Sequence, residues 1–155
     1  MTSSAEPVTT AGLVTLDRPA GEDAKAVVQS LATLLADAGR VTDADAFVEA
    51  VMAREALEST ALPGGVAIPH ARSAAVETVS VAVARLAKPA TFHEDKPAVD
   101  VVLLIAAPDE DPSAYLRLLA KLAGACVKSS FRAGLRSAGT ADEVAALVTG
   151  AIGRL

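Results

Sequence analysis

His70 ends the segment Gly65-Val66-Ala67-Ile68-Pro69-His70, whose residue types suit a reactive histidine. A residue before proline is confined to extended backbone and proline has a fixed φ, so His70 follows a stiff turn at a predicted strand end. Open α/β sheets bind ligands at strand ends of this kind. A neutral imidazole can attack phosphorus and form an N–P bond labile enough to pass the group on. The segment therefore predicts reversible phosphoryl capture, although a lone histidine is more often structural.

Such chemistry has two further requirements. If the second ring nitrogen donates to a backbone carbonyl, the tautomer is fixed and the attacking nitrogen is exposed. A cation must also stabilise the phosphoryl oxygens, and either of two arginines could supply it. Arg54 lies late in a predicted helix, whereas Arg72 is two residues past His70. Spacing alone favours Arg72, and the alternative for either arginine is a solvated surface side chain.

Three other features are weaker candidates. Asp109-Glu110-Asp111 could bind a metal, but adjacent loop carboxylates rarely converge on one ion, so we expect a solvated loop and no metal site. His93 lies in a polar loop before the most apolar segment, and we expect no role for it. Cys126 shares a helical stripe with leucines and is expected in the core. The sequence contains no Walker-type or dinucleotide glycine pattern, and we expect no cofactor.

Four strands are expected to carry these residues. They cover residues 13–16, 66–68, 78–86 and 99–105. Alternation predicts that the third is half-buried and that Pro89 lies beyond its end. The fourth is apolar throughout, which indicates a central strand covered on both faces.

Helical periodicity predicts helices over residues 21–38 and 43–57, a helix capped by Ser113, a short helical piece around Phe131 and Leu135, and a last helix through residue 148. Thr42 or Asp43 can cap the second helix, and Thr140 with Glu143 forms a capping box for the last. The stripe of the helix after Ser113 is predicted to consist of Leu116, Leu119, Leu122, Ala123 and Cys126.

This alternation predicts an α/β fold, a three-layer α/β/α sandwich around a mixed sheet of about four to five strands. A hairpin over residues 78–106 and a helix pair before residue 60 argue against a purely parallel sheet. Residues 1–11 are small and polar and are predicted to form a flexible leader. Residues 12–155 are expected to form a single domain.

The composition limits what such a domain binds. The 155 residues are 52% hydrophobic, only 3% aromatic and carry a net charge of −5, with no cluster of basic residues. Nucleic acid is therefore not an expected partner, because its recognition uses basic patches and aromatic stacking. The longest apolar run is too short to span a bilayer, so we expect no membrane insertion. The N-terminal residues lack a signal-peptide pattern and the single cysteine cannot form an internal disulfide, which favours a cytoplasmic protein.

The combination of Arg54-Glu55, Ser59-Thr60 and the segment ending at His70 resembles a known family. It is similar to the EIIA domains of the fructose–mannitol class in the bacterial phosphoenolpyruvate:sugar phosphotransferase system, which include the nitrogen-regulatory EIIA proteins. The resemblance covers roughly residues 10–150. It implies that His70 receives a phosphoryl group from the phosphocarrier protein HPr and passes it to a cysteine of an EIIB domain.

The resemblance also assigns the arginines. The arginine of the family's Arg-Glu motif matches Arg54 and helps to bind the phosphoryl group, which reverses the order that spacing favours. Thr60 and Arg72 become accessory residues. The family usually has a second histidine in the helix after the central strand, where this sequence has Tyr115. Tyrosine can donate a hydrogen bond but carries no positive charge at neutral pH, so transfer is expected to be slower or restricted to certain partners.

Three functions are compatible with this pattern. The first is a phosphocarrier in sugar uptake of the fructose class. The second is a regulatory module in which phosphorylation of His70 acts as a charge switch. The third is a degenerate homologue with reduced transfer.

Overall fold

The computed structural model describes residues 7–110 and 112–153. Residues 1–6 of the predicted leader lie outside this part. Residues 7–11 of it contact the domain, because the Val8 carbonyl accepts a hydrogen bond from the Val81 amide at 2.8 Å and Arg40 Nη1 donates to the Pro7 carbonyl at 2.9 Å. Among the described residues, no helix is long and apolar enough to cross a membrane.

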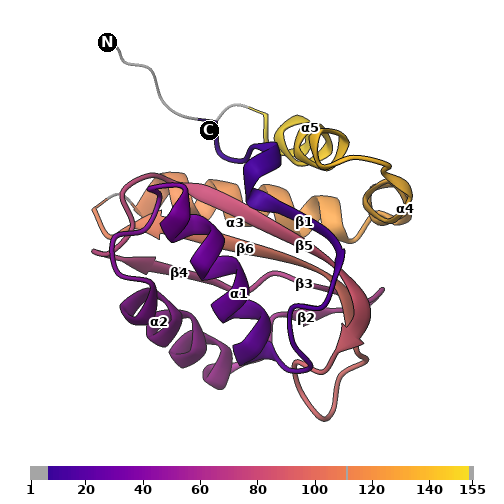
Figure 1. The fold of residues 1–155 in the computed structure, drawn as a ribbon, viewed down its shortest axis with the longest axis horizontal. Helices are drawn as coiled ribbons and strands as arrows, with labels where there is room; N and C mark the ends of the chain where they lie inside the picture. Colours follow the sequence, from indigo (N-terminus) through magenta and orange to yellow (C-terminus); the bar gives the residue numbers. More distant parts are fainter. Residues whose placement is uncertain (1–6, 111, 154–155) are drawn as a thin grey trace.

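A mixed sheet of six strands forms the middle of the molecule (Figure 1). Its strands are β1 (Val14–Arg18), β2 (Ala61–Leu62), β3 (Val66–Ala67), β4 (His70–Ser73), β5 (Ser80–Ala90) and β6 (Val99–Pro108). The order is β1-β5-β6-β3-β2, and β4 also pairs with β6. The predicted hairpin is present, since β5 pairs antiparallel with β6, whereas β1, β3 and β4 make parallel pairs.

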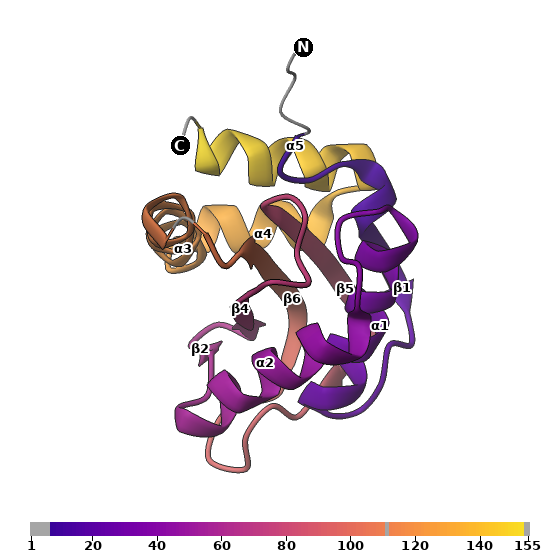
Figure 2. The same cartoon turned by 90° about the vertical axis from the view of Figure 1, so that its left-hand side faces the viewer.

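The helices form the outer layers and confirm the predicted α/β/α sandwich. They are α1 (Ala24–Asp37), α2 (Ala44–Leu57), α3 (Pro112–Cys126), α4 (Ser129–Ser137) and α5 (Ala141–Ile152), and a 3-10 turn, η1 (Ala11–Leu13), precedes β1. Figure 2 shows α1 and α2 on one face of the sheet and α3, α4 and α5 on the other. Each face has its own hydrophobic core, and β5 and β6 contribute side chains to both.

This double coverage corrects two predictions for β5. The strand was expected to be half-buried, but residues 81–84 are all buried because helices cover both faces. Pro89 was expected to lie beyond the strand, yet β5 continues to Ala90. A register irregularity between Arg85 and Ala90 accommodates the proline, which cannot donate to the strand pairing.

The buried stripe of α3 also differs from the prediction. Leu116 was placed in the core but is 59% exposed, and Leu118 is fully buried in its place. Adjacent leucines made the helical phase ambiguous, and a shift of one or two positions rotates the buried face. Ser113 was expected to precede the helix, but α3 already begins at Pro112. Cys126 is fully buried, as predicted.

Helix caps follow the sequence closely. Asp43 accepts a hydrogen bond from the Ala46 amide at 3.0 Å and caps α2, and Thr140 accepts from the Glu143 amide at 3.2 Å at the start of α5. The capping box is shifted by one residue, because the Glu143 carboxylate accepts from the amide of Gly139 and not from that of Thr140.

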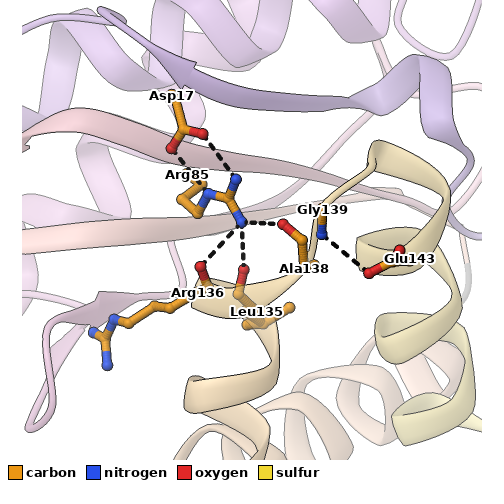
Figure 3. A network of polar contacts seen from close by, with 7 residues as sticks. All are labelled: Asp17, Arg85, Leu135, Arg136, Ala138, Gly139 and Glu143. Carbon is orange, nitrogen blue, oxygen red and sulfur yellow. Dashed lines mark hydrogen bonds and ion pairs between the residues drawn. The ribbon is translucent and has the colours of Figure 1, made fainter.

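Arg85 of β5 anchors helix α4 to the sheet (Figure 3). Its Nη1 donates to the carbonyls of Leu135, Arg136 and Ala138 at 3.1, 3.2 and 2.7 Å, which satisfies acceptors at the end of α4. Its other nitrogens pair with Asp17 of β1, and this hydrogen-bonded ion pair lowers the pKa of Asp17. The network fixes α4 beside the sheet, where α4 contacts the loop that leads to His70.

Candidate functional site

His70 is the first residue of β4 and is 5% exposed. Both β3 and β4 pair with β6 in one register, since Val66 lies opposite Val101 and His70 lies opposite Ile105. The turn at Pro69 therefore interrupts the strand without shifting it. The Pro69 carbonyl still accepts a hydrogen bond from the Ile105 amide at 2.9 Å. The central strand thus holds the histidine from one side.

The imidazole of His70 has a defined tautomer. Its Nδ1 lies 2.7 Å from the carbonyl oxygen of Ile68. Because a carbonyl only accepts, Nδ1 must carry the proton, which leaves the lone pair on Nε2. Burial lowers the pKa of His70 from its ordinary value of 6.5, and the charge of Arg54 lowers it further; the Ile68 hydrogen bond and the charge of Glu55 act in the opposite direction. The ring is therefore a neutral nucleophile at neutral pH.

Two glycines before His70 adopt backbone that other residues rarely adopt, with φ of 97° at Gly64 and 81° at Gly65. Arginine side chains of α4 lie against them. Arg136 Nη2 donates to the Gly64 carbonyl and to Asp100 Oδ1, the latter at 2.7 Å, and the Asp100 amide donates to the Gly65 carbonyl at 2.9 Å. An added Cβ at Gly64 would come within 2.5 Å of Arg132. The glycine turn is thus held by groups distant in sequence.

His70 lies in a cleft of about 250 Å³ between α2, β4 and α3. The cleft is lined by Ala50, Arg54, His70, Ala71, Arg72, Asp109 and Tyr115. Four of the five residues predicted for the site therefore share one cleft. A second cleft of about 260 Å³ also contains Arg54 and His70 and adds the fifth, Thr60.

The two arginines differ in position. Arg54 lies in the last turn of α2, is half-buried, and donates from Nη1 to the Glu58 carbonyl at 2.9 Å. Its charge influences the pKa of both His70 and Tyr115. Arg72 is exposed, and its charge is among the influences on Tyr115 but not among those on His70. The charge of Arg54 therefore acts on the imidazole although Arg54 is much farther from His70 along the chain than Arg72 is.

Tyr115 of α3 connects His70 with Arg72. Its ring centroid is 6.0 Å from that of His70, with a tilt of 54°, and the Arg72 guanidinium carbon is 5.9 Å from it. The latter distance suits a cation–π contact. Burial raises the pKa of Tyr115, so its hydroxyl keeps its proton at neutral pH and can donate.

Glu55 and Asp109 also lie at the site, although the sequence indicated Glu55 only as part of the Arg-Glu motif and Asp109 only as part of a solvated loop. Glu55 is 8% exposed, and its carboxylate accepts from the Thr60 hydroxyl at 2.5 Å and the Thr60 amide at 2.9 Å. A signal was available, because Glu55 follows Val48 and Val51 on the buried stripe of α2, where an acid needs partners. Asp109 comes directly after β6 and lines the cleft, whereas its acidic neighbours in the sequence indicated a solvated loop.

The remaining candidates lie elsewhere. His93 is exposed in the loop between β5 and β6, where its Nδ1 accepts a hydrogen bond from the Asp95 amide at 3.1 Å. The described residues contain no group of three His, Cys, Asp or Glu side chains arranged to hold a metal ion, and Asp111 is not among them. Burial raises the pKa of Cys126 to about 11, so its thiol is unreactive.

Comparison with known proteins places this geometry in a family. The model of the phosphoenolpyruvate-dependent sugar phosphotransferase system EIIA 2 family matches residues 8–150. The chain belongs to this family. The predicted family is thereby confirmed, and members of the family are components of a phosphotransferase system.

Three relatives show the range of proteins in which this domain occurs. The 2-O-alpha-mannosyl-D-glycerate-specific EIIABC component of Escherichia coli is 36% identical over 76% of this chain, but the match spans only 18% of that protein. The nitrogen regulatory protein of Pseudomonas aeruginosa is 32% identical, with 92% of this chain and 93% of that protein covered. The fructose-specific EIIA component of Haloferax volcanii is 34% identical over 81% of each.

A solved structure supports the fold. The nitrogen regulatory protein IIA-Ntr of Neisseria meningitidis superimposes with a TM-score of 0.81 at 29% identity, covering 92% of this chain and 97% of that one. Some proteins with this domain are therefore named for sugar transport, and others are named for nitrogen regulation.

Proposed function

We propose that His70 accepts a phosphoryl group from the phosphohistidine of an HPr-type carrier and passes it to an EIIB cysteine. The observation that carries the proposal is the hydrogen bond between His70 Nδ1 and the Ile68 carbonyl. It leaves the lone pair on Nε2, in a buried histidine that lines a cleft with two arginines.

Two substitutions at phosphorus make up the transfer. In the first, the Nε2 lone pair forms an N–P bond while the N–P bond of the donor histidine breaks, and the donor ring keeps the electron pair. In the second, the EIIB thiolate forms an S–P bond while the bond from Nε2 breaks. Arg54 binds the phosphoryl oxygens, and Tyr115 donates a hydrogen bond to one of them. Thr60 and Arg72 are accessory.

The test is incubation of the protein with labelled phosphoenolpyruvate, enzyme I and HPr. The proposal predicts a phosphoprotein that is stable in base and labile in acid, formed by wild type and His93→Ala but not by His70→Ala. A wild-type protein that stays unlabelled with both sugar-branch and nitrogen-branch carriers would contradict it and favour a degenerate homologue.

A regulatory role is the second candidate. It is favoured by the similarity to the Pseudomonas nitrogen regulatory protein over nearly the full length of both chains. The fructose-specific and EIIABC relatives favour a role in sugar uptake, with a fructose-class sugar as the first to test. Labelled protein mixed with EIIB distinguishes the two. Loss of label to an EIIB cysteine supports transport, and retention with every EIIB tested supports regulation.

A further inference from the structure

Glu55 is a buried carboxylate beside the site for which the transfer described above has no use. It is 8% exposed, and both its oxygens accept hydrogen bonds from Thr60. Burying a carboxylate is costly unless it is well bonded, so an acid retained here is expected to hold its neighbours firmly in place.

A continuous path of hydrogen bonds leads from Glu55 to His70. Glu55 binds the amide and hydroxyl of Thr60, the residue directly before β2. The Thr60 carbonyl accepts from the Ile68 amide at 3.2 Å. The Ile68 carbonyl in turn accepts from His70 Nδ1 at 2.7 Å. Because each of these residues is hydrogen-bonded to the next, a displacement of Thr60 would move the Ile68 carbonyl. That carbonyl determines which ring nitrogen of His70 carries the proton.

The start of the segment between these residues, at β2, has few other backbone hydrogen bonds in the sheet, whereas the glycine turn and β3 are also held by Arg136 and β6. β2 and β3 have two residues each and pair only at Ala61 with Ala67 and at Leu62 with Val66. Within residues 7–110 and 112–153, β2 is the last strand of the sheet and has no strand paired on its outer side. Two residue pairs at a sheet edge hold a strand weakly. The carboxylate bonds from α2 therefore supply much of what fixes the start of this hairpin.

We propose that Glu55 is a positioning residue, which acts through Thr60 and Ile68 to keep His70 protonated on Nδ1 and so to expose the Nε2 lone pair. The effect on phosphorylation rests on the function proposed above, whereas the effect on the ring does not. At metal sites, removal of a group that hydrogen-bonds to a ligating histidine typically costs about 10- to 100-fold in affinity or activity, and we expect the lower end of that range for Glu55.

The experiment measures the tautomer of His70 by ¹⁵N chemical shifts of its ring nitrogens in the unphosphorylated protein. Wild type is expected to be the Nδ1–H form. Glu55→Ala and Thr60→Val should each increase the Nε2–H fraction, because the first removes the acceptors and the second removes a hydroxyl donor. Thr60→Ser, which keeps that hydroxyl, should behave as wild type. Glu49→Ala removes an exposed acid of the same helix and should change nothing.

Phosphorylation rates complete the test. Glu55→Ala should be labelled about tenfold more slowly than wild type or Glu49→Ala. If Glu55→Ala does not fold, judged by its amide spectrum, the pair Thr60→Val and Thr60→Ser decides the question. An unchanged tautomer in every folded variant at these two positions would overturn the proposal. A wild-type protein that is never labelled would instead contradict the proposed phosphoryl transfer. The tautomer measurement would then still decide whether Glu55 positions His70.

Discussion

On the α2 side of His70 the contacts are hydrogen bonds in series, whereas on the α3 side they are contacts of rings and charge. The first side runs from Glu55 through Thr60 and Ile68 to the imidazole, with donor–acceptor distances between 2.5 and 3.2 Å. The second side consists of Tyr115, whose ring centroid is 6.0 Å from that of His70, and of the exposed Arg72, whose guanidinium carbon is 5.9 Å from the Tyr115 centroid.

The difference separates the hydrogen bonds that orient the histidine from the looser contacts made by Tyr115 and Arg72. Arg54 is the exception on the α2 side, because it is the residue proposed to bind the phosphoryl group. Hydrogen bonds have strict geometry, so the α2 side fixes the tautomer. Aromatic and cation–π contacts tolerate wider geometry, so the α3 side can change residue type without displacing the ring. A tyrosine at position 115 is therefore compatible with the observed orientation of the His70 ring. We expect substitutions on the two sides to have different consequences.

The largest expected difference is between the labelling rates of two single variants, one lacking Arg54 and the other lacking Arg72. Arg54→Ala should lower the rate of labelling by HPr about 10²-fold, the usual cost of losing one group that stabilises developing charge. Arg72→Ala removes an exposed cation and should lower it no more than about fivefold. Quench-flow or time-course labelling measures both rates. Equal effects would show that the two sides contribute alike and that Arg54 has no special role.

The pH dependence of labelling tests the environment of His70 itself. Burial lowers its pKa below 6.5, so the neutral ring persists to lower pH than in a free histidine. The rate should stay constant as pH falls through 6.5 and then decrease about tenfold per unit below the lowered pKa. A rate that already halves at or above pH 6.5, with the carrier kept in excess, would contradict the role given to burial.

The same shift has a consequence for stability. The unfolded chain takes up a proton near its ordinary pKa while folded His70 stays neutral, so wild type should lose unfolding free energy as pH falls below about 6.5 and through the lowered pKa. His70→Gln lacks this group and should lose less over the same range. Urea unfolding of both proteins at several pH values makes the comparison, and identical pH profiles would argue against the shift.

Tyr115→His gives the smallest expected effect. A histidine restores a group that can be charged and should raise the labelling rate a few-fold at pH 6, where a histidine is partly protonated. Tyr115→Phe keeps the ring but removes the hydroxyl and should lower the rate slightly. If Tyr115→His is no faster than wild type at any pH, the lost charge does not limit transfer.

Periodicity and turn residues were sufficient to predict the layers of the fold. The 3.6-residue spacing of α1 and α2 and the apolar run of β6 are local signals, and they predicted the elements correctly. Leu116 shows where such signals end, since neighbouring leucines in α3 offered two helical phases and only packing against the sheet selects Leu118. Pro89 shows the same for strands, because a strand tolerates a proline only where the neighbouring strand needs no N–H donor at that position.

Only part of the site could be predicted from the sequence. His70 and its stiff turn are local in sequence, and the Arg-Glu motif indicated Arg54. The acceptor at Ile68 and the cleft shared with Tyr115 depend on how β4 aligns with β6. The arginines of α4 that hold the glycine turn come from more than 60 positions downstream, as Arg136 bonds to Gly64 across 72 positions. No local pattern connects residues so far apart.

The most direct test of the central claim is to locate the phosphorus atom in the wild-type protein after labelling by phosphoenolpyruvate, enzyme I and HPr. Peptide mapping under basic conditions identifies the residue, and ³¹P and ¹⁵N NMR of the intact protein identify the ring nitrogen. A single phosphoryl group on Nε2 of His70 is expected. Phosphorus on His93, on Nδ1 of His70 or on any other residue would contradict it, and so would a protein that carries none.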